Sequence, residues 1–381
     1  MDIVKLNPIS ALVNDTLTND KYTICDSSDK PIAYLVRSFD MHEYKVASSA
    51  IAIARAGAGV NNIPIQDMTN KGVCVFNTPG ANANAVKELV ICALLLSCRK
   101  IYPAINWTQK LQDGELTVEK QVEKGKKAFI GQEIKGKVLG IIGLGAIGRL
   151  VSDAAIALGM EIIGYDPFLS GPAKNALNPA VKITTDLNDI FSASDFITLH
   201  VPATPDTKGF INKDSISKMK DGVVIINCAR GELFNVDDVI EAVKSGKIGR
   251  VVTDLPSQKL LGVENIITFP HLGASTPEAE DNCAVMAANE LKEFIENGNV
   301  INSVNFPCVK SIKTGDRVTV LANIENAENI ATDIISKECT IKSTAKGTRG
   351  ELTYLIFDLD KQISDKAFKA LDEKFIKVRK I

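Results

Sequence analysis

The chain has 381 residues, which is too long for one ordinary hydrophobic core and suits two or three domains. Hydrophobic residues make up 45% of it and charged residues 24%, and the net charge of −2 excludes a global field that would draw it onto nucleic acid or an acidic membrane. The eight cysteines show no Cys-x-x-Cys spacing, so we expect reduced thiols, no metal site and no disulfide framework.

The sequence carries no signal for secretion or membrane insertion. Its first residues, MDIVKLNPIS, lack a basic start followed by a long apolar core. The apolar run Leu89–Leu96 is far shorter than the ~20 residues that cross a bilayer. We therefore expect a soluble cytoplasmic protein.

The first hundred residues alternate short strands with turns and helices. We predict strands at Tyr34–Arg37, at the end of Ser49–Arg55 and at Val73–Phe76, with glycine-rich or asparagine-rich loops between them. Loops that follow strands are where α/β sheets bind their ligands. Arg37 and Arg55 stand at two of these strand ends, where they are either solvated surface charges or an anion clamp.

A helical stretch follows from Asn84. Its apolar residues cover most faces, which predicts a buried helix between domains. Residues 115–131 are rich in lysine and glutamate and indicate a solvated helix or arm. The hydrophobic excess of Val86–Cys98 and this arm also indicates an oligomer.

The stretch 137–148, KVLGIIGLGAIG, reads as strand, tight turn and helix. The first glycine of Gly143-x-Gly145-x-x-Gly148 permits the turn, the second lets backbone N–H groups approach a pyrophosphate, and the third lets helix and strand pack closely. The phosphates would lie at the positive end of the helix. Packing alone can require the same glycines.

A second predicted strand, Met160–Tyr165, ends at Asp166. A carboxylate at this place accepts both hydroxyls of an adenosine ribose and repels a 2′-phosphate, which favours NAD over NADP. The alternative is a plain turn residue before Pro167. Because strand, glycines, helix, strand and acid come in the expected order, we predict an NAD site.

Residues 132–282 keep a β/α rhythm, which predicts a doubly wound parallel sheet of the Rossmann type. Its six expected strands are Lys137–Ile142, Met160–Tyr165, Phe196–Val201, Gly222–Asn227, Arg250–Asp254 and Ile266–Phe269.

Arg230 and His271 follow the fourth and sixth of these strands, at the sheet edge where a bound nicotinamide would point. Arginine holds a carboxylate with two parallel hydrogen bonds, and histidine exchanges a proton near pH 7. Together they suit oxidation of a 2-hydroxy acid. The alternatives are a salt bridge between Arg230 and Glu232 and a buried, hydrogen-bonded His271.

After Cys308 the pattern changes to a small α+β module. An amphipathic helix at Met286–Asn297 comes before it and could return the chain to the first domain, which would then be discontinuous in sequence. The module's expected order is βαββαβ, at Arg317–Ile324, Ala327–Lys337, Cys339–Thr344, Leu352–Leu359, Asp365–Lys374 and Phe375–Ile381.

Seven motifs occur in order along the chain: VRS at 36–38, RAGAGVNN at 55–62, NTPGAN at 77–82, GLGAIG at 143–148, YDP at 165–167, NCARGE at 227–232 and PHLGAST at 270–276. With them the chain resembles the D-isomer-specific 2-hydroxyacid dehydrogenase family over nearly its whole length. The resemblance implies a Rossmann-type NAD-binding domain at 100–282, inserted in a discontinuous, flavodoxin-like substrate-binding domain formed by 1–99 and 283–310. It also implies a C-terminal ACT-like regulatory or association domain at 311–381.

The resemblance assigns a role to each motif. Arg230 would bind the substrate carboxylate and keto oxygen, His271 would be the catalytic acid and base, and Arg37, Arg55 and Asn77 would face the substrate. The residues expected to contact NAD are Thr78, Gly143, Gly145, Ala146, Ile147, Gly148, Asp166, Cys228, Ala229, Arg230, Asp254, His271, Gly273 and Ala274.

The paired arginines and the C-terminal module favour a phosphorylated substrate. The resemblance therefore implies NAD-dependent oxidation of 3-phospho-D-glycerate to 3-phosphohydroxypyruvate, the first step of the phosphorylated serine pathway. A dehydrogenase for lactate, glyoxylate or hydroxypyruvate, or 2-hydroxyglutarate is an alternative, and so is a non-enzymatic NAD-sensing corepressor. We expect a homodimer or homotetramer, and serine is a candidate effector.

Two positions depart from the family's pattern. Lys259 stands where many relatives have a glutamate that pairs with the catalytic histidine. The sequence therefore assigns no carboxylate partner to His271. The turn at 325–329, Glu-Asn-Ala-Glu-Asn, lacks the glycine and proline usual in serine-binding turns of ACT domains.

Overall fold

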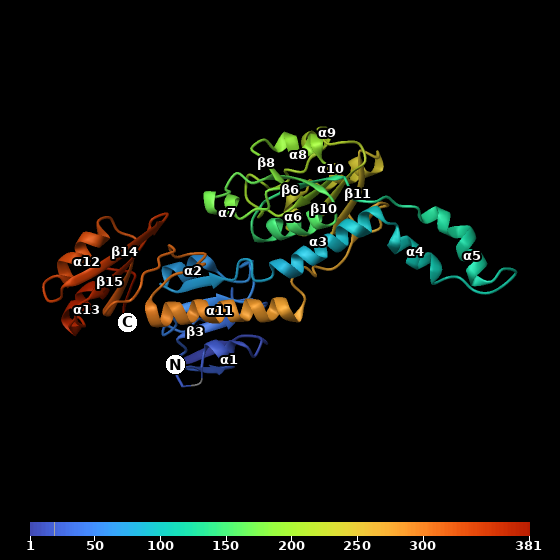
Figure 1. Ribbon diagram of the computed structural model, residues 1–381. Helices are drawn as coiled ribbons and strands as arrows, with labels where there is room; N and C mark the ends of the chain where they lie inside the picture. Colours follow the sequence, from blue (N-terminus) through green and yellow to red (C-terminus); the bar gives the residue numbers. More distant parts are fainter. Residues whose placement is uncertain (19) are drawn as a thin grey trace. The chain divides into compact units, whose positions relative to one another are not determined.

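The computed structural model describes residues 1–18 and 20–381. The chain forms two compact units, one made of Met1–Asn82 with Pro277–Ile381 and the other of Ala83–Thr276 (Figure 1). Each unit has its own hydrophobic cores. We call them the discontinuous unit and the central unit.

The first sheet of the discontinuous unit has five parallel strands in the order β2-β1-β3-β4-β5, which is the flavodoxin-like order. Sequence patterns predicted β3, β4 and β5, with bounds shifted by one to three residues, and missed β1 and β2. The strands are β1 (Asp2–Lys5), β2 (Thr23–Cys25), β3 (Ala33–Val36), β4 (Ala52–Arg55) and β5 (Cys74–Asn77).

Three helices belong to this sheet: α1 (Val13–Thr16), α2 (Ile65–Asn70) and α11 (Pro277–Asn297). The 21-residue α11 returns the chain to the first sheet, and it begins well before the Met286 expected from the sequence. Ala284, Ala287 and Ala288 are fully buried in the core shared with β4 and β5, because small side chains let helix and sheet approach closely.

The sheet of the central unit has seven parallel strands in the order β12-β11-β10-β9-β6-β7-β8. This is the Rossmann strand order with one strand added, so the predicted fold class is confirmed. Six strands match the predictions within two residues. The edge strand β8 was missed because it has only four residues, of which Val181 alone is buried. The strands are β6 (Val138–Ile142), β7 (Glu161–Tyr165), β8 (Val181–Thr184), β9 (Phe196–Leu199), β10 (Val223–Asn227), β11 (Ile248–Thr253) and β12 (Ile266–Thr268).

The first helix of the central unit corresponds to the apolar helix that the sequence predicts from Asn84 and that we expected to lie between domains. That helix, α3, packs on α6, β10 and β11, so its apolar faces complete the core of this unit. The unit boundaries consequently fall at 82/83 and 276/277, whereas the sequence placed them at 99/100 and 282/283. The helices are α3 (Ala83–Cys98), α4 (Ile101–Thr108), α5 (Val118–Gly125), η1 (Lys126–Phe129), α6 (Ala146–Ala157), α7 (Gly171–Asn175), α8 (Leu187–Ala193), α9 (Lys213–Ser217), η2 (Gly231–Leu233) and α10 (Val236–Lys244).

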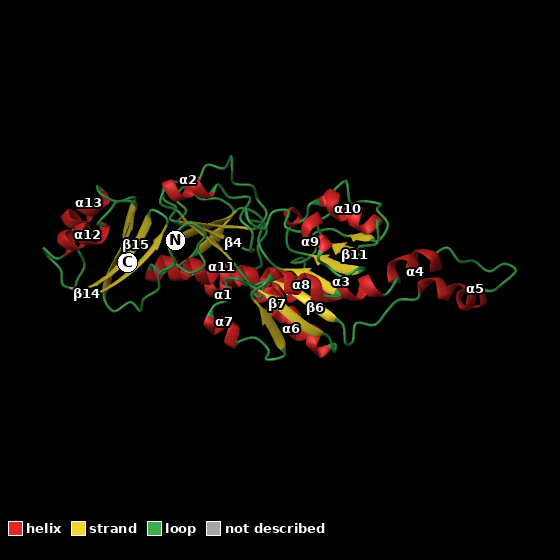
Figure 2. Cartoon of the chain, turned by 90° about the horizontal axis from the view of Figure 1, so that it is seen from above, coloured by secondary structure: helices red, strands yellow, loops and turns green. Residues whose placement is uncertain are grey.

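Helices α4 and α5 extend away from the sheet of the central unit in both views (Figures 1 and 2), and neither contains a buried residue. Helix α5 lies within the arm expected at 115–131. Helix α4 lies in the second half of the helical stretch predicted from Asn84, and we call α4, α5 and η1 together the arm. None of the helices in the described ranges is both long and apolar enough to span a membrane.

The C-terminal part of the discontinuous unit is an antiparallel sheet with the order β14-β15-β13-β16 and two helices, so the predicted βαββαβ order is confirmed. Two arginines attach it to the end of α11. The buried Arg317 donates to the carbonyl of Asn297 at 2.6 Å, and the partly buried Arg379 donates to the carbonyls of Phe294 and Ile295 at 3.0 and 2.9 Å. The elements are β13 (Asp316–Ala322), α12 (Ala327–Ile335), β14 (Ile341–Arg349), β15 (Leu352–Leu359), α13 (Asp365–Asp372) and β16 (Lys377–Lys380).

Candidate active site

The three glycines between β6 and α6 have different surroundings. Gly143 has φ +96°, and a Cβ there would lie 2.5 Å from the carbonyl oxygen of His200. A Cβ on Gly148 would collide with the carbonyl oxygen of Gly143. Nothing lies within 4 Å of the Cβ position at Gly145. Packing therefore requires the outer two glycines, whereas the middle one leaves an open approach to the backbone.

The N-terminus of α6 faces this open approach. Gly145 is its N-cap residue and supplies no side-chain acceptor, so the first N–H groups of the helix, beginning at Ala146 and Ile147, receive no cap. Uncapped N–H groups and the positive end of the helix dipole favour an anion. These residues fit the pyrophosphate of a dinucleotide.

Asp166 follows β7 and is held in one orientation. Its Oδ2 accepts a hydrogen bond from the Leu144 N–H at 2.9 Å, and its Oδ1 accepts one from the Phe168 N–H at 2.9 Å. The carboxylate is therefore tied to the glycine turn. It has lone pairs left for ribose hydroxyls.

The loop after β10 carries Cys228, Ala229 and Arg230. The buried Asn227 organises it: its Oδ1 accepts from the Ala229 N–H at 3.1 Å and its Nδ2 donates to the Arg230 carbonyl at 2.9 Å. Sequence reasoning did not give Asn227 this role, although asparagine at a strand end commonly bonds to the backbone two residues on. The partly exposed Arg230 guanidinium donates to the Ala229 carbonyl at 2.6 Å.

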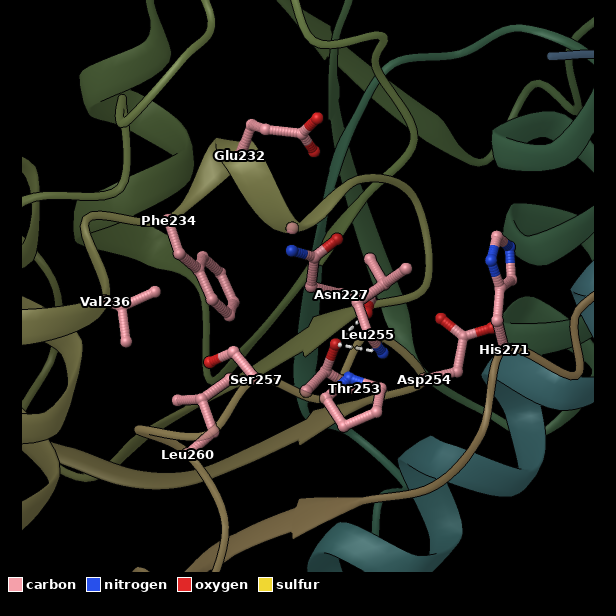
Figure 3. Close-up of a pocket in the computed structure, with 12 residues that line it drawn as sticks. Asn227, Glu232, Phe234, Val236, Thr253, Asp254, Leu255, Ser257, Leu260 and His271 are labelled. Atoms are coloured by element: carbon pink, nitrogen blue, oxygen red, sulfur yellow. Dashed lines mark hydrogen bonds between the residues drawn. The ribbon is translucent and has the colours of Figure 1, made fainter. Parts of the chain in front are cut away.

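His271 follows β12 and lies beside Asp254, which follows β11 (Figure 3). The imidazole is exposed, whereas Asp254 is fully buried. Among the described residues neither oxygen of Asp254 has a hydrogen-bond partner of normal geometry. Burial raises the pKa of this carboxyl, and the nearby His271 charge opposes that shift. Two orphaned buried oxygens fit the predicted contact with a polar ligand group.

A cavity of ≈ 570 Å³ opens at the carboxyl ends of β10 and β11. Asp254 and His271 line this cavity, and so does Gly231, which follows Arg230 directly in the chain. Lys259, which stands at the usual glutamate position, pairs instead with the exposed Asp237 at 2.8 Å. The lining residues are Asn227, Gly231, Glu232, Phe234, Val236, Thr253, Asp254, Leu255, Pro256, Ser257, Leu260 and His271.

The last two predicted cofactor residues of the central unit follow His271. Gly273 is buried, and a Cβ on it would lie 3.3 Å from a methyl carbon of Val86 and 3.5 Å from Oδ2 of Asp254. Ala274 is partly buried. The loop after β12 therefore passes directly over Asp254.

In the discontinuous unit the register aligns the predicted substrate residues. Val36 pairs with Arg55, and Arg55 pairs with Asn77, so Arg55 and Asn77 end two adjacent parallel strands, and Arg37 comes directly after the end of the next strand, β3. The guanidinium of Arg55 lies over Gly57, where a Cβ would collide with it; Gly57 has φ +153°. The structure thus brings these three residues to one edge of the sheet.

Neighbouring loops hold this row in place. Asn77 Nδ2 donates to the Ala58 carbonyl at 2.6 Å. The buried Thr78 donates its N–H to the Gly57 carbonyl at 3.1 Å, and its hydroxyl lies against the Cys283 thiol. Across residues 1–18 and 20–381 there is no group of three or more His, Cys, Asp or Glu side chains that could hold a metal ion.

The fold and the glycine turn define a dinucleotide-binding α/β protein. Residues 92–273 match the family described as "D-isomer specific 2-hydroxyacid dehydrogenase, NAD binding domain". The hydroxypyruvate reductase of Thermotoga maritima is 44% identical over 237 residues, which cover 60% of this chain and 72% of that protein. The chain belongs to the D-isomer-specific 2-hydroxyacid dehydrogenase family, and its central unit contains the NAD-binding domain of that family.

Two further relatives are informative. The D-3-phosphoglycerate dehydrogenase of Methanocaldococcus jannaschii is 37% identical over 289 residues, covering 74% of this chain and 53% of that protein, so the match spans about half the length of that relative. The crystal structure of NAD⁺-bound 3-phosphoglycerate dehydrogenase from Entamoeba histolytica superposes with a TM-score of 0.63 at 26% identity, covering 80% of this chain and 98% of that one.

Proposed function

We propose that this protein catalyses the NAD-dependent oxidation of 3-phospho-D-glycerate to 3-phosphohydroxypyruvate, the first step of the phosphorylated L-serine pathway. The observation that carries the proposal is the row of Arg37, Arg55 and Asn77 at the ends of three adjacent strands. Two arginines at one sheet edge form a clamp for a phosphate group, which an unphosphorylated acid would not need. The 3-phosphoglycerate dehydrogenases among the relatives support the assignment.

Each site residue has a task in this reaction. Arg230 binds the carboxylate and the C2 oxygen of the substrate with its guanidinium fork. His271 takes the proton of the C2 hydroxyl, and the buried Asp254 places a negative charge beside the imidazolium that results. NAD, held by the start of α6 and by Asp166, would supply the hydride acceptor for C2. Asp166, fixed by the Leu144 and Phe168 N–H groups, selects NAD over NADP.

The remaining predicted contacts complete the cofactor site. Gly145, Ala146 and Ile147 at the start of α6 hold the pyrophosphate, with Gly143 and Gly148 shaping the turn. Cys228, Ala229, Gly273, Ala274 and Thr78 contact the rest of the dinucleotide through loops that follow strands.

A second candidate function is reduction of hydroxypyruvate. The 44% identity to the hydroxypyruvate reductase of Thermotoga maritima favours it. That substrate has a hydroxyl where 3-phosphohydroxypyruvate has a phosphate, so the two functions differ in their need for Arg37 and Arg55.

The deciding experiment measures NADH oxidation with 3-phosphohydroxypyruvate, hydroxypyruvate, pyruvate and 2-oxoglutarate. We expect a strong preference for the phosphorylated acid. Arg55→Ala should raise its KM by about tenfold or more and leave the KM for hydroxypyruvate nearly unchanged. Equal use of all four acids by the wild type would refute the proposal in favour of a broader 2-hydroxyacid dehydrogenase.

Two variants test the mechanism itself. Arg230→Ala and His271→Ala should each lower kcat by about 100-fold or more while NADH binding, followed by fluorescence, is retained. Normal turnover in either variant would contradict the assigned role.

For the C-terminal sheet we propose an ACT-like regulatory or association domain with serine as its effector. Its βαββαβ order and antiparallel sheet support this. Asn326, in the turn before α12, has φ +56°, so asparagine supplies there the left-handed conformation that glycine often provides. A serine titration of the NADH oxidation rate tests the proposal, and a rate unaffected by serine would leave association as the domain's role.

We also propose that the protein is a cytoplasmic homodimer or homotetramer that pairs through its arm. Ile101, Tyr102, Ile105 and Ile130 are 44–70% exposed there, whereas Val86 and Val90 of α3 are buried in the central unit. Light scattering of Ile105→Glu against the wild type tests this. All eight cysteines are free thiols, as a reducing compartment favours.

A further inference from the structure

Arg37 is held in the discontinuous unit through both its backbone and its guanidinium. Asn7 Oδ1 accepts a hydrogen bond from its backbone N–H at 2.9 Å. Its Nη2 lies 2.6 Å from Oε1 of Glu280, and the two side chains are 35% and 42% exposed. The backbone of Arg37 is therefore fixed by a neutral group, and its guanidinium is paired with an anion.

Glu280 lies on the first turn of α11, next to the arginine row. The helix begins at Pro277 and carries Glu278 and Glu280 in that turn, where negative charge is favoured by the helix dipole. One turn further on, the buried Cys283 thiol experiences the same charges: burial raises its pKa, Arg55 and Arg37 lower it, and Glu280 raises it again. Glu280 therefore adds a negative charge to the sheet edge at which Arg37 and Arg55 stand.

We propose that Glu280 is a specificity-determining residue, whose carboxylate competes with the phosphate group of the substrate for Arg37. The inference rests on the proposed function. A half-exposed ion pair contributes little, whereas a phosphate carries nearly two charges and three acceptor oxygens for the guanidinium fork. A phosphorylated acid therefore displaces Glu280. A singly charged carboxylate does not gain enough to do so, and Glu280 keeps Arg37 from binding it.

The test compares wild type, Glu280→Gln and the matched control Glu278→Gln, which neutralises an exposed glutamate of the same helical turn. In Glu280→Gln we expect the KM for 3-phosphohydroxypyruvate to fall about two- to fivefold at unchanged kcat. The KM for hydroxypyruvate should stay within about twofold, since that acid has no second anionic group for Arg37. The KM for 2-oxoglutarate, whose distal carboxylate Glu280 no longer excludes from Arg37, should fall by a larger factor than the KM for the phosphorylated acid. Glu278→Gln should match the wild type. A KM for the phosphorylated acid that is unchanged or raised in Glu280→Gln would overturn the inference.

A binding measurement separates this inference from the proposed function. Inorganic phosphate is titrated calorimetrically into the same three proteins and into Arg37→Ala. Tighter binding to Glu280→Gln than to wild type, lost in Arg37→Ala, supports the competition even for an enzyme that prefers another acid. Equal affinity of wild type and Glu280→Gln for phosphate would refute it, whatever the substrate.

Discussion

The Asp166 carboxylate accepts a hydrogen bond from the Leu144 N–H at 2.9 Å, which ties the end of β7 to the glycine turn after β6. The residue expected to bind the ribose is therefore positioned by the loop expected to bind the pyrophosphate. Phe168 N–H, donating to the other oxygen at 2.9 Å, completes the orientation. Asp166 therefore supports the turn in addition to its proposed contact with the ribose.

Asp166→Ala should weaken NAD binding about tenfold and reduce the preference for NAD over NADP, because it removes the ribose acceptor and the charge that repels a 2′-phosphate. Dissociation constants for both cofactors measure this. Asp153→Ala, an exposed acid on α6, is the control. An unchanged ratio of the two constants would rule out the assignment.

Asp254→Asn should lower kcat for reduction about tenfold. The substitution removes the buried carboxyl group beside His271, the proposed proton donor. The steady-state rate of NADH oxidation at saturating 2-oxo acid is the measurement. Lys259→Ala, which breaks only an exposed pair with Asp237, should keep the wild-type kcat, and an Asp254→Asn kcat equal to that of Lys259→Ala would contradict the role of Asp254.

Glu290 on α11 gives the discontinuous unit a pH-dependent stability. Its side chain is 96% buried, Oε1 accepts from Asn302 Nδ2 at 2.7 Å, and burial raises its pKa from 4.5 to about 8. The folded chain keeps a proton that the unfolded chain releases above pH 4.5. Stability contributed by this group is therefore highest below about pH 4.5 and falls as the pH rises to about 8.

Glu290→Gln should remove that slope. At pH 8 the variant should be more stable than the wild type by up to a few kcal/mol, whereas near pH 5 the two should differ little. Urea unfolding at both pH values measures the difference, with Glu278→Gln as the exposed control on the same helix. A wild-type slope that persists in Glu290→Gln would mean that another group titrates.

The buried pair of Arg317 and Asp358 fastens the C-terminal sheet. Arg317 Nε and Nη2 donate to the two Asp358 oxygens at 2.7 and 3.0 Å, both side chains are fully buried, and Thr314 and Ser343 also donate to Oδ2. Arg317→Ala should cost about 3–5 kcal/mol, since it leaves a buried charge unpaired. Chemical unfolding checks this against Lys346→Ala, whose exposed pair with Glu328 is worth less than about 1 kcal/mol. A loss near that of Lys346→Ala would show that solvent reaches Asp358.

Local patterns were enough to find the elements that contain their own signals. The Gly143, Gly145 and Gly148 turn and the acid at 166 are set by the chain's neighbouring residues, because a tight turn and a following helix leave few alternatives. The short edge strands β2 and β8 were missed, since three and four residues are too few to show a clear period. The role of Asn227 was missed because the NCARGE motif was interpreted through its ligand-facing residues, whereas the Asn227 side chain bonds to the backbone of its own loop.

The sequence by itself determined the fold class, the βαββαβ order and which residue types stand at the strand ends, because periodicity and turn chemistry are local. The tertiary structure alone decided which of them meet. It placed α3 in the core of the central unit, laid Asp254 beside His271 while Lys259 bonds to Asp237, and brought Glu280 to Arg37 across 243 positions. Such contacts depend on packing between distant segments, which no short stretch of sequence encodes.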